Sequence, residues 1–291
     1  MSETDSEAEA AHSEAGDGRL PPSGIALVIL LGFIWGINWP AIRTAVTEIS
    51  PWTFRVICLA VGAATLFVTL FIRGTALRVP RAEIMPLVVL ALLNVTGYQL
   101  LTAFGLSEME AGRGVILAFT FPLWSVLFGT VVLREKLTGT RLVALCLGLA
   151  AMALLLGPEI TRLGHTPMGA VFLICAATSW AAATVMFKLI KWTIPSGAIA
   201  AWQLLIGGVP VLAAALLFAP APEFSALSAE AVISIVYASV IAVSFGQWIW
   251  FRVLQLLPAA VAANSTLAVP VIGVFAGALL LGETGIPTSI N

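Results

Sequence analysis

Amide, hydroxyl and phenol side chains stand in the middle of long apolar stretches of this sequence. They are Asn38, Asn94, Thr96, Tyr98, Gln99, Thr184, Gln203, Gln247, Asn264 and Ser265. Polar groups within an apolar span face the interior of a helix bundle or a wet cavity, because lipid offers them no hydrogen bonds. Each can bind a small ligand or join two helices by a hydrogen bond worth about 0.6 kcal/mol, and both roles stay open.

Tryptophan supplies a second kind of candidate contact. Trp35, Trp124, Trp180 and Trp248 lie well inside apolar stretches, away from the ends where aromatic belts are expected. Aromatic walls with a few polar groups suit a pocket for an amphipathic small molecule, and a packed helix interface is the alternative. The residues that we expect to bind a substrate are Trp35, Asn38, Tyr98, Gln99, Trp124, Trp180, Gln247 and Trp248.

The sequence offers no suitable residues for catalysis or for metal binding. All 15 acidic residues lie in the N-terminal tail, in connections or at the ends of apolar stretches. The two histidines and three cysteines are too widely spaced for a metal cluster or a disulfide framework. We therefore predict no catalytic residues, no metal and no cofactor. The firm intramembrane charge is Arg55, which can bind a substrate carboxylate or extend to the nearby interface.

The composition is that of a membrane protein. Hydrophobic residues make up 60% of the 291 positions and charged residues only 10%, at a mean hydropathy of +1.04, whereas a soluble domain has about 25% charged residues. The 14 basic and 15 acidic residues nearly cancel, so the chain lacks the basic field that binds nucleic acid. The expected partners are the lipid bilayer and a small-molecule substrate. The oligomeric state stays open, with a monomer as one option.

Nine stretches are long and apolar enough to cross a bilayer, which needs about 20 residues per helix. They cover residues 24–45, 51–72, 84–106, 111–133, 140–157, 167–190, 196–219, 230–256 and 259–281. Residues 1–23 are acidic and poor in apolar side chains, so we expect a disordered tail without a signal peptide. Lys and Arg are concentrated in the connections on the side of the N-terminus, which predicts a cytoplasmic N-terminus.

An internal repeat relates the two halves of the chain. A shift of 148 residues places Gln99 on Gln247, Pro122 on Pro270 and Glu135 on Glu283, and a shift of 145 places Trp35 on Trp180. Chance similarity between apolar sequences is the alternative. Residues 24–157 contain five helices, and residues 158–291 form the second copy. Because five is an odd number, the second copy enters the membrane from the opposite side, which is an inverted repeat. We predict an all-α polytopic membrane protein with a ten-helix fold, of which the tenth helix is missing after Glu283.

Four repeat-related residues are candidates for movement. Pro122 and Pro270 interrupt corresponding helices, where they can act as hinges or shape a cavity. Glu135 and Glu283 close helices on opposite faces, where they can form gating salt bridges or remain solvated loop charges.

Several of these residues together resemble the drug/metabolite transporter superfamily, and in particular its EamA-like branch. The resemblance rests on Trp35-Gly36, on Arg55 after Pro51, and on the endings from Pro122 to Leu133-Arg134-Glu135 and from Pro270 to Leu281-Gly282-Glu283. It covers about residues 24 to 291. It implies two five-helix repeats, both termini in the cytoplasm, and export of amino acids or other metabolites. The many tryptophans resemble those of the aromatic amino acid exporters.

The sequence and the resemblance predict a secondary transporter rather than an enzyme. We expect export of small neutral or zwitterionic metabolites across a bacterial inner membrane by alternating access. Amino acids are the expected substrates, with aromatic amino acids as one option. The missing membrane-embedded acid favours uniport or exchange over proton antiport. The alternatives are a proton-coupled exporter of drugs or metabolites, a channel and an intramembrane enzyme.

Overall fold

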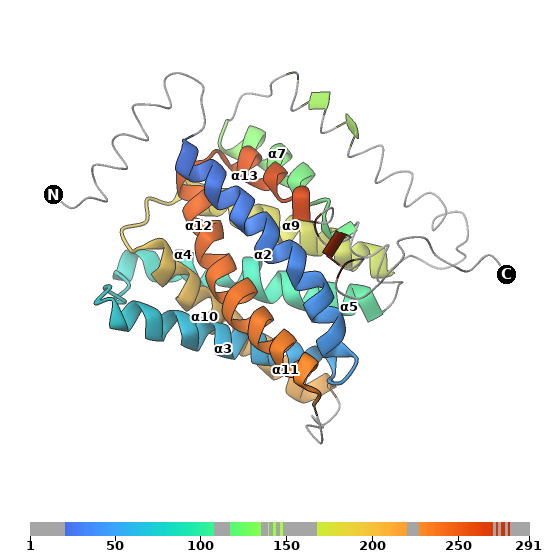
Figure 1. The fold of residues 1–291 in the computed structure, drawn as a ribbon. Coiled ribbons are helices and arrows are strands. Elements are labelled where there is room, and N and C mark those ends of the chain that lie inside the picture. The colour runs from blue at the N-terminus through green and yellow to red at the C-terminus, as the bar shows by residue number, and fades with distance from the viewer. Residues whose placement is uncertain are drawn as a thin grey trace.

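The computed structural model of the chain describes residues 21–107, 117–134, 168–219 and 227–269, with isolated positions at 139–147 and 272–279. All regular elements in these ranges are helices (Figure 1). The first half contributes α2 (Pro22–Val46), α3 (Pro51–Ile72), α4 (Arg81–Ala91), η2 (Leu92–Gly97), α5 (Tyr98–Ser107) and α7 (Phe121–Val132). The second half contributes α9 (Met168–Leu189), α10 (Ser196–Phe218), α11 (Ala229–Val236), η3 (Tyr237–Phe245), α12 (Gly246–Leu256) and α13 (Ala259–Ser265).

Six helices in this part of the chain are long and apolar enough to cross a membrane. They confirm six predicted spans: 24–45, 51–72, 84–106, 167–190, 196–219 and 230–256. The fourth and ninth spans are described in part, as α7 and α13. Most of the predicted fifth span, 140–157, lies outside the described residues. Phe71 and Leu216 are each 78% exposed on the bundle surface, which suits contact with lipid.

Two spans contain a π-helical segment in their middle. The segment η2 links α4 to α5, and η3 links α11 to α12. The shift of 148 residues places Leu92–Gly97 onto residues 240–245, within η3. Two hydrogen bonds of 2.8 Å tie η2 to its neighbours. The Ser179 hydroxyl of α9 donates to the Leu93 carbonyl oxygen in η2, and the Thr96 hydroxyl of η2 donates to the Gly207 carbonyl oxygen in α10. Such segments are frequent at functional sites, and apolar periodicity did not predict them.

The two halves of the chain pack into each other rather than side by side. The helix α3 lies against α10, α5 against α9, and α2 against α11 and α12 (Figure 1). Glycine allows the closest of these approaches. A Cβ atom at Gly207 would lie 2.5 Å from the Cβ atom of Val95, so only a residue without a side chain fits between α10 and η2.

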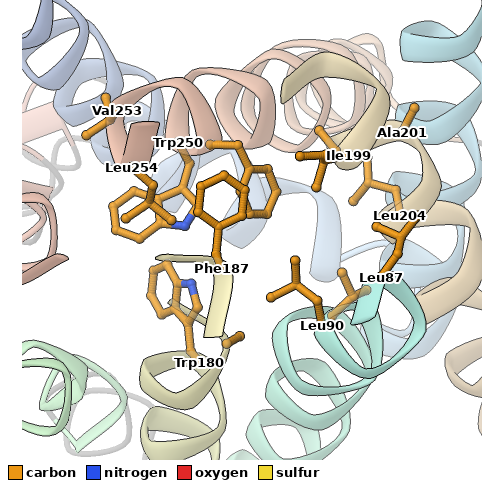
Figure 2. Packing of buried hydrophobic residues seen from close by; sticks show 14 of the residues in the cluster. Leu87, Leu90, Trp180, Phe187, Ile199, Ala201, Leu204, Trp250, Val253 and Leu254 are labelled. Atoms are coloured by element: carbon orange, nitrogen blue, oxygen red, sulfur yellow. The ribbon is translucent and has the colours of Figure 1, made fainter. Parts of the chain in front are cut away.

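Within the described ranges, buried apolar residues form one large cluster and two small ones. The large cluster fills the end of the bundle at which α2 begins, called the N-terminal end here. It joins α3, α4, α9, α10 and α12 through residues such as Leu66, Leu87, Phe187, Ile199 and Leu254, of which the last four are labelled in Figure 2. At the opposite end, one small cluster lies around Phe54, Cys58 and Ile235. The other lies around Leu117 and Leu173.

Candidate substrate site at the centre of the bundle

Five aromatic rings from five helices meet half-way along the bundle. They belong to Trp35 of α2, Tyr98 of α5, Phe121 of α7, Trp180 of α9 and Trp250 of α12, and are called the aromatic cluster below. The Phe121 ring stacks on Trp180 with centroids 4.0 Å apart, and the Tyr98 ring lies 5.0 Å from Trp180. The Trp250 ring is 5.7 Å from Trp180 and 5.8 Å from Trp35. Trp180 is thus the centre of the cluster.

The helices fix these rings by specific contacts. The Trp35 indole donates a hydrogen bond of 3.0 Å from Nε1 to the carbonyl oxygen of Ala242 in η3. Gly246 leaves room for the same ring, because a Cβ atom there would lie 2.5 Å from Nε1. Trp180 and Trp250 face each other at the edge of the large apolar cluster (Figure 2). A rigid aromatic cluster at this depth can present ring faces to an apolar or aromatic ligand group.

Three of the predicted site residues, Trp35, Tyr98 and Trp180, lie together in this cluster. Two predicted tryptophans lie elsewhere. The Trp124 indole donates to the Thr120 hydroxyl at 3.3 Å and packs against Phe128. The Trp248 ring lies beneath the Arg73 guanidinium, at 5.5 Å. Neither ring is paired with a ring of the aromatic cluster in the described structure, although both tryptophans pack against the large apolar cluster.

Phe121 and Trp250 belong to the cluster, and the sequence reasoning missed both. Trp248 and Trp250 are two residues apart in α12, so they point to different sides of the helix. The spacing therefore shows that only one can face the centre, and it does not show which. Phe121 directly precedes Pro122, and that repeat-related proline was the available signal.

Unpaired polar atoms lie close to the cluster. The Asn38 Oδ1, Gln99 Oε1 and Thr102 Oγ1 atoms are buried and have no hydrogen-bond partner within the described part of the chain. Asn38 and Thr102 follow Trp35 and Tyr98 by about one helical turn, toward the opposite end of the bundle. No hydrogen bond joins Gln99 to Gln247 in the described structure. An unpaired buried acceptor costs about 1–3 kcal/mol, so these atoms call for a donor from a ligand or from another state of the protein.

Several other candidate residues form hydrogen bonds within the protein. The Asn94 amide donates to the Gln203 carbonyl oxygen at 2.8 Å, and both side chains are buried. The Thr184 hydroxyl donates to the Trp180 carbonyl oxygen at 3.0 Å, and the Ser265 hydroxyl to that of Ala262 at 2.6 Å. Asn94 and Gln203 therefore join η2 to α10, whereas the hydroxyls of Thr184 and Ser265 bind the backbone of their own helices.

The predicted moving residues fall partly within the described ranges. Pro122 is buried and is the second residue of α7, a position that tolerates proline because its missing N–H would have no helical partner. A turn at Phe119 and Thr120 precedes it. Glu135, Pro270 and Glu283 lie outside the described residues.

Carboxylates connect helix ends at both ends of the bundle. At the N-terminal end, the Glu83 Oε1 atom accepts hydrogen bonds from the backbone N–H and the hydroxyl of Thr193. At the opposite end, Glu48 accepts from the Ser228 hydroxyl at 2.6 Å and from its backbone N–H at 2.8 Å. The Ser228 hydroxyl also caps α11. Glu83 is only 6% exposed, and its Oε2 atom has no partner in the described structure.

Comparison with known proteins identifies relatives along the whole length of this arrangement. The EamA-like transporter family matches the chain twice, over residues 22–157 and 167–289. An uncharacterized transporter of Bacillus subtilis, YoaV, is 28% identical over 257 residues, covering 88% of each chain. A probable amino-acid metabolite efflux pump of Salmonella typhimurium is 25% identical over 274 residues, covering 89% of this chain and 87% of the relative.

One solved crystal structure shares the fold. It covers 89% of this chain and 91% of its own, with a TM-score of 0.70 and 19% sequence identity. A shorter match, 26% identical over 130 residues, links 45% of the chain to 41% of an S-adenosylmethionine/S-adenosylhomocysteine transporter of Chlamydia muridarum.

Proposed function

The chain belongs to the EamA-like transporter family and is a membrane transporter, and we propose that it exports small neutral or zwitterionic metabolites, chiefly amino acids, by alternating access. The observation that carries the proposal is the aromatic cluster with the unpaired Asn38 and Gln99 acceptors beside it. Ring faces suit an apolar side chain, and amide oxygens suit an ammonium group. The probable amino-acid metabolite efflux pump among the relatives supports the same substrate class.

The helix contacts support an inverted repeat, which builds alternating access into the fold. If the second half is a turned-over copy of the first, contacts between the halves must occur in pairs. The packing of α5 on α9 has such a counterpart in α12 on α2, and α3 packs on its own equivalent, α10. The shift of 145 residues also places Glu48 on Thr193, so the two carboxylate contacts correspond. The ten-helix architecture is therefore part of the proposal.

We place the N-terminal end of the bundle in the cytoplasm of a bacterial cell. The described cations at that end are Arg73, Arg78, Arg81, Arg134, Lys188, Lys191 and Arg252, and those at the opposite end are Arg43 and Arg55. Lys and Arg mark the cytoplasmic side of membrane proteins. A cysteine introduced at exposed Ala76, in a background without the native cysteines, is then labelled by an impermeant reagent only after the cells are opened. A cysteine at Thr47 is labelled in intact cells, and the reverse pattern inverts the topology.

Uptake into proteoliposomes tests the transport activity. Purified protein is reconstituted and offered a panel of labelled amino acids, with and without a proton gradient. Saturable uptake that needs no gradient supports uniport or exchange. No uptake or counterflow of any amino acid, from protein shown to be folded, contradicts the substrate class.

Glu83 favours a second candidate, a proton-coupled exporter. Its carboxylate is buried at the start of α4 and one oxygen is unpaired within the described structure, so it is the described acid best placed to carry a proton. In that case uptake requires the proton gradient, and Glu83→Gln retains exchange but loses the gradient dependence. Gradient dependence that persists in Glu83→Gln removes this residue from the coupling.

A further inference from the structure

Arg55 is a charged side chain for which the described structure provides no counter-ion. It is the fifth residue of α3, about 6 Å along the helix from its start, and it is half-buried. The described acidic residues are Glu48, Glu83 and Glu230, and none forms an ion pair with it. A half-buried guanidinium without an anionic partner is costly, because its five donors lose water.

A contact of Trp52 turns one side of α3 toward α5, the helix that carries Tyr98 of the aromatic cluster. The Trp52 ring packs edge-on against Phe104 of α5, with centroids 5.8 Å apart. Arg55 lies one turn deeper than Trp52 on the same side of α3. Phe104 and Tyr98 lie on the same helix, and the Tyr98 ring packs on Trp180 at 5.0 Å. The side of α3 that carries Arg55 therefore faces the helix that contributes Tyr98 to the aromatic cluster.

The polar groups around Arg55 match the two charged groups of a zwitterion. The buried Gln99 Oε1 and Asn38 Oδ1 atoms lack a donor, whereas Arg55 lacks an acceptor in the described structure. An α-amino acid supplies both, since its ammonium group donates and its carboxylate accepts. An extended Arg55 that reaches the interface is the alternative, and transport by Arg55 variants distinguishes the two positions.

We infer that Arg55 binds the carboxylate of the substrate and restricts transport to α-amino acids and related carboxylates with an apolar or aromatic side chain. This inference rests on the proposed function. It makes Arg55 a specificity-determining residue: the guanidinium forms a two-point hydrogen-bonded ion pair with the carboxylate. Amines of the same size then bind weakly, because their apolar group fits the rings and they bring no partner for the guanidinium.

Counterflow of labelled L-phenylalanine in proteoliposomes tests this assignment, with L-phenylalanine and L-phenylalaninamide as unlabelled competitors. The amide keeps the ring and the amino group and lacks only the carboxylate charge. For the wild-type protein we expect the amide to compete at least about tenfold less well, from the usual strength of a charged hydrogen bond. Arg55→Gln should remove most of this preference, because it weakens the binding of phenylalanine and leaves that of the amide unchanged. Arg55→Lys should retain part of the preference.

Arg43→Gln is the matched control, because it removes an exposed cation from α2 at the same end of the bundle. It should leave the preference unchanged. A preference that stays the same in Arg55→Gln overturns the assignment of Arg55, while counterflow itself upholds the proposed function. Lack of counterflow of every amino acid in the wild type contradicts the proposed function instead. If Arg55→Gln does not fold, the partial loss in Arg55→Lys decides, and an unchanged preference there also overturns the assignment.

Discussion

The two ends of the bundle differ in how their buried apolar residues are joined. At the N-terminal end, Leu70, Leu87 and Leu254 belong to one cluster that unites helices of both halves. At the opposite end, the clusters around Phe54 and around Leu173 are separate within the described residues. A continuous core holds helices together, and separate cores allow two groups of helices to part. The difference predicts that the N-terminal end is the more tightly closed of the two.

The carboxylate contacts show the same difference on a smaller scale. Glu83 at the start of the third span binds Thr193, which follows the sixth span. Glu48, which follows the first span, binds Ser228 at the start of the eighth span. Glu83 is buried against Thr193, whereas Glu48 is exposed beside Ser228. An exposed ionic contact is worth little because water competes for it. The buried contact therefore contributes more to holding its end closed.

Removing the central ring should have the largest effect. Trp180→Ala takes away the ring that contacts Trp35, Tyr98, Phe121 and Trp250, and truncation of a buried tryptophan costs about 3–5 kcal/mol. We expect transport to be lost and the N-terminal end to become reachable from outside by an impermeant thiol reagent at an introduced cysteine.

Two variants separate this effect from general loss of packing. Trp124→Ala removes a tryptophan outside the cluster and should retain most of the transport. Trp180→Phe keeps an apolar ring and should transport at an intermediate rate, with folding checked by size-exclusion chromatography. Equal losses in Trp124→Ala and Trp180→Ala would remove the special role of the cluster.

Glu83→Ala and Glu48→Ala make the same change at the two ends. The first leaves the Thr193 donors without their charged acceptor, and we expect the free energy of unfolding to fall by about 1–3 kcal/mol. The second changes an exposed contact and should have little effect. Thermal unfolding of the two purified variants measures the difference, and equal destabilisation would contradict the contrast between the ends.

The Asn94 and Gln203 pair tests how η2 is held against α10. Either Asn94→Leu or Gln203→Leu leaves a buried amide unpaired and should cost about 1–2 kcal/mol. The double variant should cost less than the sum, because it removes both polar groups. A double-mutant cycle by thermal unfolding gives the coupling between them, and additive effects would mean that the 2.8 Å hydrogen bond contributes nothing.

The smallest effect concerns pH at the opposite end. The Ser228 hydroxyl and then its backbone N–H hold the pKa of Glu48 below its ordinary value of 4.5. Since the folded state favours the ionised form, the contact stabilises above pH 4.5 and is lost as the pH falls through the lowered pKa. Ser228→Ala should therefore make the loss of stability on acidification smaller. Unfolding curves at a series of pH values check this, and parallel curves for both proteins would contradict it.

Helix positions were predictable because they depend on local sequence. About twenty apolar residues are needed to cross a bilayer, so runs of that length in the sequence determined six described spans within a few residues. The repeat of Gln99 at Gln247 and of Trp35 at Trp180 could also be seen in the sequence. The π-helical turns could not, because Ser179 and Thr96, which bind beside η2, reach carbonyl groups of other helices.

Composition and the family resemblance were enough to predict a helical membrane transporter with aromatic and amide side chains at half-depth. Which of these side chains meet depends on the packing of the helices. Trp250 and not Trp248 faces Trp180, and Asn94 is bound to Gln203 while Gln99 keeps an unpaired oxygen. The physical reason is that an apolar span is equally stable in lipid at any rotation about its axis. Its rotation is set by the side chains of neighbouring helices, which are distant in the sequence.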